Sequence, residues 1–219
     1  LAVFPVVLYH AGIAGFGGGF VGVDVFFVIS GYLMAAVIIG ELDRGEFSLL
    51  QFYERRVRRI FPALFAMIAA SAVMAWFVFM PVEFTYFARS LKATVLFISN
   101  IRFQREVGYF DIESQLKPLL HTWSLAVEEQ FYIVFPIAVV LIVRFFRRYL
   151  ALILLATLAA SLIASTWAVH YAPEKAFYLA QYRAWELLLG AVLALSLIPR
   201  PTQRLAREAM AGTGVVLIG

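Results

Sequence analysis

Near the start of the chain, a histidine and an aspartate stand at the two ends of a glycine-rich bend. His10 ends one apolar run, and Asp24 lies near the start of the next. A histidine can take a proton from a hydroxyl nucleophile, and a carboxylate can orient the imidazole and stabilise its protonated form. The alternative is a structural pair, in which the histidine bonds to backbone and the aspartate complements a helix dipole. The local sequence fits both interpretations.

A run of arginines forms a second candidate site. Arg55, Arg56, Arg58 and Arg59 precede another apolar run. Guanidinium groups bind phosphate through two hydrogen bonds at once, and a helix start would add backbone donors. The same cluster also suits a cytoplasmic loop that orients the protein and contacts anionic lipid head groups. The residues alone leave both interpretations open.

A polar stripe at the start of a later apolar run forms a third candidate site. His121, Ser124 and Glu128 fall on one face of a helix, because residues three or four apart are neighbours there. Glu129 follows directly. Glutamates in a first turn favour the helix dipole, but two carboxylates at the start of a span also suit the wall of a polar cavity. We favour the cavity wall.

Four further polar residues lie within the apolar runs. Tyr9, beside His10, and Ser30 are assigned to the same substrate cavity. Ser30 lacks the G-x-S-x-G context of a hydrolase nucleophile. Arg183 and Glu186, three residues apart inside an apolar run, are expected to pair with each other.

The composition is that of a polytopic membrane protein. The 219 residues are 63% hydrophobic and 15% charged, with a mean hydropathy of +0.87, whereas a soluble domain is about half apolar and a quarter charged. The chain has no cysteine, which excludes disulfides and thiolate metal sites, and its three histidines lie far apart. We therefore expect no metal and no nucleic-acid partner.

The apolar runs predict an all-α bundle of transmembrane helices. A span needs about 20 apolar residues. Parts of two more spans lie at 1–9 and 210–219, which makes about seven in all. The complete candidates are residues 21–40, 60–80, 123–143, 150–169 and 177–198.

One apolar stretch, residues 84–103, is interrupted by Arg89, Lys92 and Arg102. If it does not cross, the loops 41–59, 144–148 and 200–208 lie on one side of the membrane, with 5, 3 and 3 basic residues. Basic residues concentrate in cytoplasmic loops, which favours this arrangement and a re-entrant or interfacial segment. The arginine cluster then faces the cytoplasm, and the histidine–aspartate pair faces outward.

Taken together, these segments resemble the acyltransferase 3 family of integral-membrane O-acyltransferases. The glycine-rich segment resembles the bacterial branch that modifies cell-surface carbohydrate, often with a fused extracytoplasmic SGNH-type domain. The matching pieces follow the family's order and are spread over most of the chain: 8–11, 18–32, 52–62, 119–132 and 183–190.

The resemblance implies a role for two motifs. His10 matches the histidine of the family's Arg-x10-His motif and would be the catalytic base; the motif's arginine would precede Leu1. Arg56 and Arg59 match the Arg-x-x-Arg motif, which implies contact with the phosphates of a cytoplasmic acyl-CoA donor. The family typically has about ten spans and a re-entrant segment before the fourth.

The expected protein is a bacterial inner-membrane O-acyltransferase, with residues 1–219 forming one transmembrane domain that is incomplete at both ends. It would move an acyl group, expected to be acetyl, from acetyl-CoA to a hydroxyl of an extracytoplasmic carbohydrate such as lipopolysaccharide O-antigen. Direct transfer and relay through an acyl-enzyme stay open. The alternative is a proton-coupled transporter or flippase, which would also use ionisable residues at midplane and broken helices.

Overall fold

Every regular element in the described part of the chain is a helix, as the hydropathy pattern predicts. The computed structural model describes residues 3–12, 18–106, 117–195, 208–209 and 212–214. The longer helices are α1 (Val3–His10), α2 (Gly22–Asp43), α3 (Leu49–Val78), α4 (Pro81–Val95), α5 (Ser99–Glu106), α6 (Thr122–Phe146), α7 (Leu150–Tyr171) and α9 (Ala180–Ala194). The short ones are the 3₁₀ turns η1 (Gly19–Val21) and η3 (Arg147–Tyr149) and the helix α8 (Pro173–Tyr178).

Three helical stretches among the described residues are long and apolar enough to cross a membrane: Gly19–Asp43, Leu49–Val78 and Thr122–Tyr171. The third contains both α6 and α7, joined at η3. The all-helical membrane fold is therefore confirmed. The total of seven spans stays a prediction, and most of the last predicted run, 210–219, lies outside the described residues.

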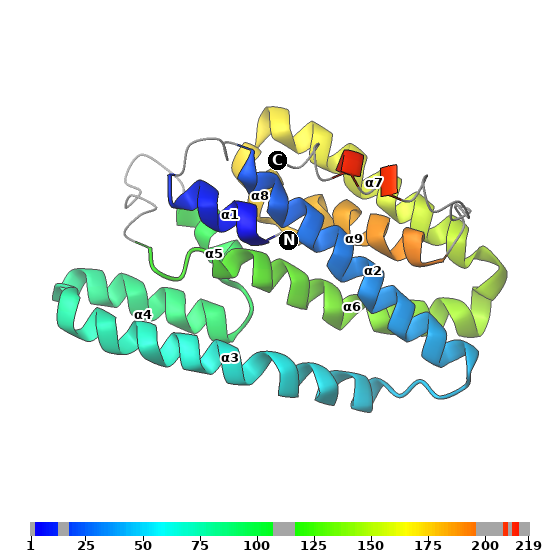
Figure 1. The fold of residues 1–219 in the computed structure, drawn as a ribbon, viewed down its shortest axis with the longest axis horizontal. Helices are drawn as coiled ribbons and strands as arrows, with labels where there is room; N and C mark the ends of the chain where they lie inside the picture. Colours follow the sequence, from blue (N-terminus) through cyan, green and yellow to red (C-terminus); the bar gives the residue numbers. More distant parts are fainter. Residues whose placement is uncertain (1–2, 13–17, 107–116, 196–207, 210–211, 215–219) are drawn as a thin grey trace.

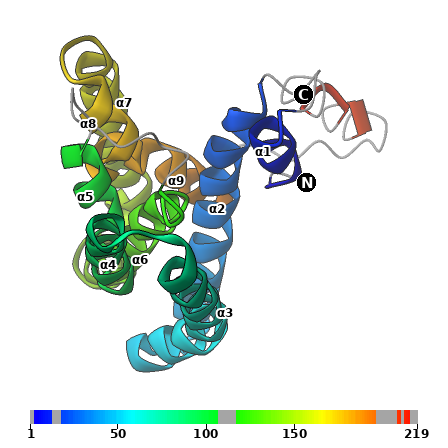
Figure 2. The ribbon, with the colours of Figure 1, turned by 90° about the vertical axis from the view of Figure 1, so that its left-hand side faces the viewer.

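The core of the bundle lies where α2 packs on α9, with α7 on the far side of α9 (Figures 1 and 2). Two glycines make this packing possible. A Cβ atom on Gly31 would lie 1.9 Å from the carbonyl oxygen of Leu187, and one on Gly190 would lie 1.9 Å from that of Val28. The two backbones are thus in direct contact, which is the usual function of small residues between membrane helices.

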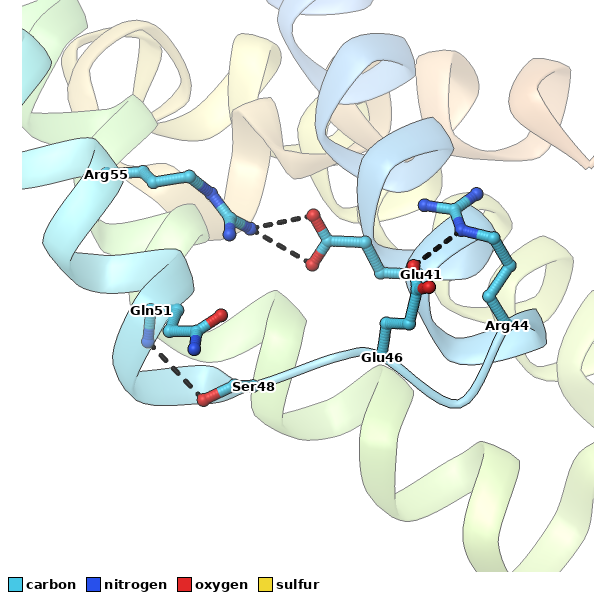
Figure 3. A network of polar contacts seen from close by, with 6 residues as sticks. All are labelled: Glu41, Arg44, Glu46, Ser48, Gln51 and Arg55. Atoms are coloured by element: carbon cyan, nitrogen blue, oxygen red, sulfur yellow. Dashed lines mark hydrogen bonds and ion pairs between the residues drawn. The ribbon is translucent and has the colours of Figure 1, made fainter.

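Helix α3 begins earlier than the sequence predicts, so the arginine cluster lies on a helix rather than in a loop. Its N-cap residue, Ser48, accepts a hydrogen bond from the backbone N–H of Gln51 at 3.5 Å. At this junction, Arg55 donates to both carboxylate oxygens of Glu41, at 2.8 and 3.0 Å, and thereby ties α3 to the end of α2 (Figure 3).

Helices α3 and α6 run antiparallel along one edge of the bundle (Figure 1). The hydroxyl of Tyr53 donates to the carbonyl oxygen of Ile133 at 2.8 Å, and one turn further along α3, Arg56 contacts Glu129. Successive positions on α3 therefore meet earlier positions on α6. This register places Arg59 near the start of α6.

The segment 84–103 does not form one continuous helix, because α4 ends at Val95 and α5 begins at Ser99. Phe97, between them, has a positive φ of 53°, which is uncommon for a side chain of this size. Gln130 of α6 donates to the carbonyl oxygen of Phe97 and to Asn100, both at 2.8 Å. The break is thus fixed by polar contacts; a re-entrant or interfacial placement stays a prediction.

Candidate active site

A cavity of about 530 Å³ opens between α3 and the starts of α2 and α6. Four of the predicted site residues line it: Arg59 from α3, and His121, Ser124 and Glu128 along the start of α6. α1 contributes Val6. The rest of the wall is chiefly apolar and includes Val23, Phe26, Ile60, Leu64, Met67 and Leu125. The cavity therefore combines one cation with a polar stripe in apolar surroundings.

The polar stripe on α6 runs from the protein surface into its interior. His121 is exposed and Glu128 is only 5% exposed, two helical turns further along. Desolvation lowers the pKa of His121, partly opposed by a hydrogen bond to the backbone of Pro118. The imidazole is therefore neutral at pH 7. Ser124 donates to the carbonyl oxygen of His121 at 3.2 Å.

Glu128 is held by two hydroxyl groups. Ser30 of α2 and Tyr132, one turn further along α6, both donate to the same carboxylate oxygen, and the two hydroxyls also contact each other. All three side chains are buried. A buried carboxylate needs such donors, because leaving it unsatisfied carries a full desolvation penalty. Ser30 therefore lies behind the cavity wall and supports Glu128.

The positive charge of Arg56 is balanced by a carboxylate inside the protein. Its guanidinium lies 3.4 Å from the centroid of the Tyr132 ring and 3.2 Å from Glu129, and both charged side chains are less than 20% exposed. The predicted cavity residue Glu129 therefore serves as the partner of Arg56. With Ser30 and Glu128, these residues form one continuous network between α2, α3 and α6.

The other three arginines of the cluster are more exposed, and they differ in their partners. Arg55 pairs with Glu41, and Arg58 pairs with Glu54 at 2.7 Å on the exposed face of α3. Arg59 lines the cavity, and no ion pair within the described residues involves it. Of the four predicted donor-binding arginines, Arg59 is thus the one placed to meet an anion in the cavity.

Asp24 forms an ion pair with Arg183 of α9, which also lies 3.1 Å from Glu186. The predicted Arg183–Glu186 pair is therefore present and includes Asp24 as a third member. Arg183 also faces the ring of Phe27, 5.5 Å from its centroid. The spacing of three residues on a helix predicted the Arg183–Glu186 pair. The contact with Asp24 could not be predicted, because Asp24 and Arg183 lie far apart in the sequence.

The predicted catalytic histidine lies at the end of α1. The backbone of His10 is one helical turn beyond Val6, but its side chain lies outside the described part of the structure. Its predicted contact with Asp24 therefore stays a prediction. Tyr9 is 42% exposed and packs edge-on against Phe20, with ring centroids 6.0 Å apart.

One member of the site, Tyr132, was not predicted as functional. Its position four residues after Glu128 is the signal that could have identified it, because such residues are neighbours on a helix. Within the residues described, no group of three or more histidine, aspartate or glutamate side chains could hold a metal ion.

The whole chain, residues 1–219, matches the protein family described as “Acyltransferase domain”. BcsY of Komagataeibacter xylinus, named as a proposed membrane-bound transacylase, is 38% identical over 221 residues, covering 100% of this chain and 54% of BcsY. The peptidoglycan O-acetyltransferase OatA of Listeria monocytogenes is 33% identical over 201 residues, covering 89% of this chain and 32% of OatA.

A protein of Haemophilus influenzae without an assigned function is 36% identical over 180 residues, covering 78% of this chain and 73% of that protein. The chain thus spans about half the length of BcsY and a third of OatA. No solved structure matches it.

Proposed function

Since the chain belongs to the acyltransferase 3 family, we propose that it forms the membrane part of a bacterial O-acyltransferase. The enzyme would move an acyl group, expected to be acetyl, from a cytoplasmic coenzyme A thioester to a hydroxyl of an extracytoplasmic carbohydrate. The names of its relatives support this assignment, since OatA is a peptidoglycan O-acetyltransferase and BcsY a proposed transacylase. Lipopolysaccharide O-antigen and other surface glycans are the acceptors we consider.

The observation that carries the proposal is the shared cavity. Arg59 comes from the arginine-rich start of α3, which we place on the cytoplasmic side, and His121 comes from the start of α6, which we place on the outer side. The register of α3 against α6 brings Arg59 close to the start of α6, so groups predicted on opposite sides of the membrane line one cavity. A donor held from one side and an acceptor from the other can therefore reach the same place.

The two ends of the cavity suit the two substrates. Arg59, which has no ion-pair partner in the described part of the chain, offers its guanidinium to a donor phosphate, a charge-assisted contact of the kind that arginine makes best. The neutral imidazole of His121 and the hydroxyl of Ser124 offer hydrogen bonds to a sugar. Arg56, already paired with Glu129, would act as a positioning residue that fixes Tyr132 and Glu128 behind the wall.

In this proposal, His10 is the general base. It takes the proton of the acceptor hydroxyl, and the hydroxyl oxygen forms a bond to the thioester carbonyl carbon. The carbon–sulfur bond then breaks, and the coenzyme A thiolate takes the proton from the imidazolium. The support for this role is the motif match and the place of His10, one turn after the cavity residue Val6.

The test is transfer from labelled acetyl-CoA to surface glycan in cells that produce the full-length protein. A general base contributes about 10²–10⁴-fold, so His10→Ala should lower transfer at least about 100-fold. Arg59→Ala should raise the donor KM about tenfold or more, as expected for a lost hydrogen bond to a charged group. Arg44→Ala, which removes an exposed arginine paired with Glu46, is the matched control and should keep wild-type transfer.

Unchanged transfer in His10→Ala would overturn the catalytic assignment. If His10→Ala loses transfer but Arg59→Ala keeps the wild-type donor KM, the assignment of His10 as the base stands and the assignment of Arg59 as a donor contact is wrong. Coenzyme A-independent solute flux by the wild type, without glycan modification, would favour the transporter instead.

A further inference from the structure

A second cavity, of about 330 Å³, lies between the end of α4 and α5. This cavity lies next to the first one. Thr122 lines the first cavity and Ala93 lines the second, and the hydroxyl of Thr94, beside Ala93, forms a hydrogen bond with that of Thr122 at 3.0 Å. The second cavity contains none of the residues assigned to acyl transfer. Its charged lining consists of Arg89, Lys92, Arg102, Arg105 and Glu106.

The break between α4 and α5 brings these charges together. Arg89 and Lys92 are three residues apart on α4, and Arg102 and Arg105 are three apart on α5, so each pair occupies one helix face. The polar contacts of Gln130 with Phe97 and Asn100 fix the angle between the two helices. The break between α4 and α5, fixed by these hydrogen bonds, therefore places all four cationic side chains around the second cavity.

Among the described residues, the positive charge of this cavity is largely uncompensated. Glu106 pairs with Arg102, which also donates to Ser90 at 3.5 Å. Within the described residues, no ion pair involves Arg89, Lys92 or Arg105, and all three are exposed. Like charges gathered in a concave site repel one another and attract an anion, most strongly where water is partly excluded.

The rim of the cavity is apolar. Leu96 and Ile98 line it and remain 55% and 42% exposed, and Val95 beside them is 38% exposed. A small soluble anion would gain nothing from these side chains. A ligand that carries both a phosphate and a hydrocarbon chain would contact the cationic side chains as well as the apolar rim.

We propose that this cavity binds the phosphate of an anionic membrane lipid. The phosphate lies among Arg89, Lys92 and Arg105, and the acyl chains lie along Leu96 and Ile98. Basic pockets between membrane helices bind anionic head groups in this way, and arginine adds bidentate hydrogen bonds to the phosphate oxygens. The site is independent of the proposed acyl transfer.

The experiment is a lipid titration of the full-length protein in a non-ionic detergent, with bound lipid counted by native mass spectrometry. Phosphatidylglycerol should bind more tightly than phosphatidylcholine. The double variant Arg89→Gln/Arg105→Gln should weaken phosphatidylglycerol binding at least about tenfold, because two hydrogen bonds to charged groups are lost. Arg144→Gln/Arg148→Gln, which removes two exposed arginines elsewhere, should leave that affinity within about twofold, since exposed charges contribute little.

A second variant and a second ligand distinguish binding of a lipid from binding of a free phosphate compound. Leu96→Asn should weaken phosphatidylglycerol binding and leave pyrophosphate binding unchanged. Competition of pyrophosphate with phosphatidylglycerol at equal affinity would overturn the lipid assignment. Unchanged phosphatidylglycerol affinity in Arg89→Gln/Arg105→Gln would overturn the site itself.

Discussion

Burial separates Arg56 from the neighbouring arginines of α3. Its pair with Glu129 lies inside the protein, with side chains 18% and 11% exposed, whereas the pair of Arg58 with Glu54 is 78% and 54% exposed. Removing one member of a buried pair strands the other charge, but an exposed charge is solvated by water. Two residues of the same type, two positions apart, should therefore contribute very differently to stability.

We predict that Arg56→Met lowers the free energy of unfolding by about 3 kcal/mol, because Glu129 is left buried without its cation. Arg58→Met is the matched control and should change it by less than about 1 kcal/mol. Chemical denaturation in detergent micelles measures both. Equal effects of the two substitutions would contradict the difference in burial.

The triad of Asp24, Arg183 and Glu186 allows a sharper test. Arg183→Met leaves Glu186, which is 1% exposed, without a cation, and should cost about 3–5 kcal/mol of stability. Asp24→Asn keeps the Arg183–Glu186 pair and should cost less.

Adding Glu186→Gln to Arg183→Met should restore part of the stability, because the stranded charge is removed. Thermal unfolding of the single and double variants measures this coupling. Additive losses in the double variant would argue against a shared buried network.

At the level of the site, helical spacing predicted neighbours within one helix but not the contacts between helices. The spacing of His121, Ser124 and Glu128 placed them on one helix face, and the cavity contains all three. The contacts of Asp24 with Arg183 and of Arg56 with Glu129 join different helices. Such contacts depend on packing between helices, which helical periodicity does not encode.

Among the elements, α2 and α9 are fixed by the contact of their backbones. We predict that Gly31→Ala destabilises the protein strongly, since its Cβ would lie 1.9 Å from a backbone oxygen of α9 and backbone cannot move aside as a flexible side chain can. Overpacking of this kind costs about 1–3 kcal/mol or more. The measurement is the midpoint of thermal unfolding in detergent.

The control is Gly40→Ala, on the same helix. The nearest atom to its added Cβ is the end of the Arg44 side chain, at 3.6 Å, which is an ordinary contact. This substitution should leave stability unchanged or raise it by about 0.5–1 kcal/mol, because alanine favours a helix over glycine. A loss as large as that in Gly31→Ala would contradict close packing as the cause.

Helix positions were predicted well for most of the complete apolar runs, although the run 177–198 is divided at Leu179 between α8 and α9. The runs 21–40, 123–143 and 150–169 correspond to α2, α6 and α7. The start of α3 was missed, because its first turns carry charges and a hydropathy pattern treats them as a loop. The position of the break at Phe97 could not be predicted, because it depends on Gln130, which lies in a different helix.

For the whole molecule, the distribution of basic residues among the loops predicts the orientation of the protein in the membrane. The loop at Glu46 should face the cytoplasm, and Lys175, between α7 and α9, should face outward. The chain contains no cysteine, so a single introduced thiol reports its own location without background from this part of the protein.

We predict that a membrane-impermeant maleimide labels Lys175→Cys in intact spheroplasts but labels Glu46→Cys only after permeabilisation. Both positions are exposed, so accessibility in the folded protein does not limit the reaction. Labelling of Glu46→Cys from outside would reverse the orientation and place the arginine cluster on the wrong side for a cytoplasmic donor.

The backbone contacts at Gly31 and at Gly190 also have a mechanical consequence. With their backbones touching, α2 and α9 cannot approach further, and with α7 they make the stiff side of the bundle. α3 forms the facing wall and reaches α6 through long side chains, such as Arg56. Side-chain contacts yield more easily than packed backbone does. We therefore expect any change in the width of the cavity to come from tilting of α3 rather than from movement between α2 and α9.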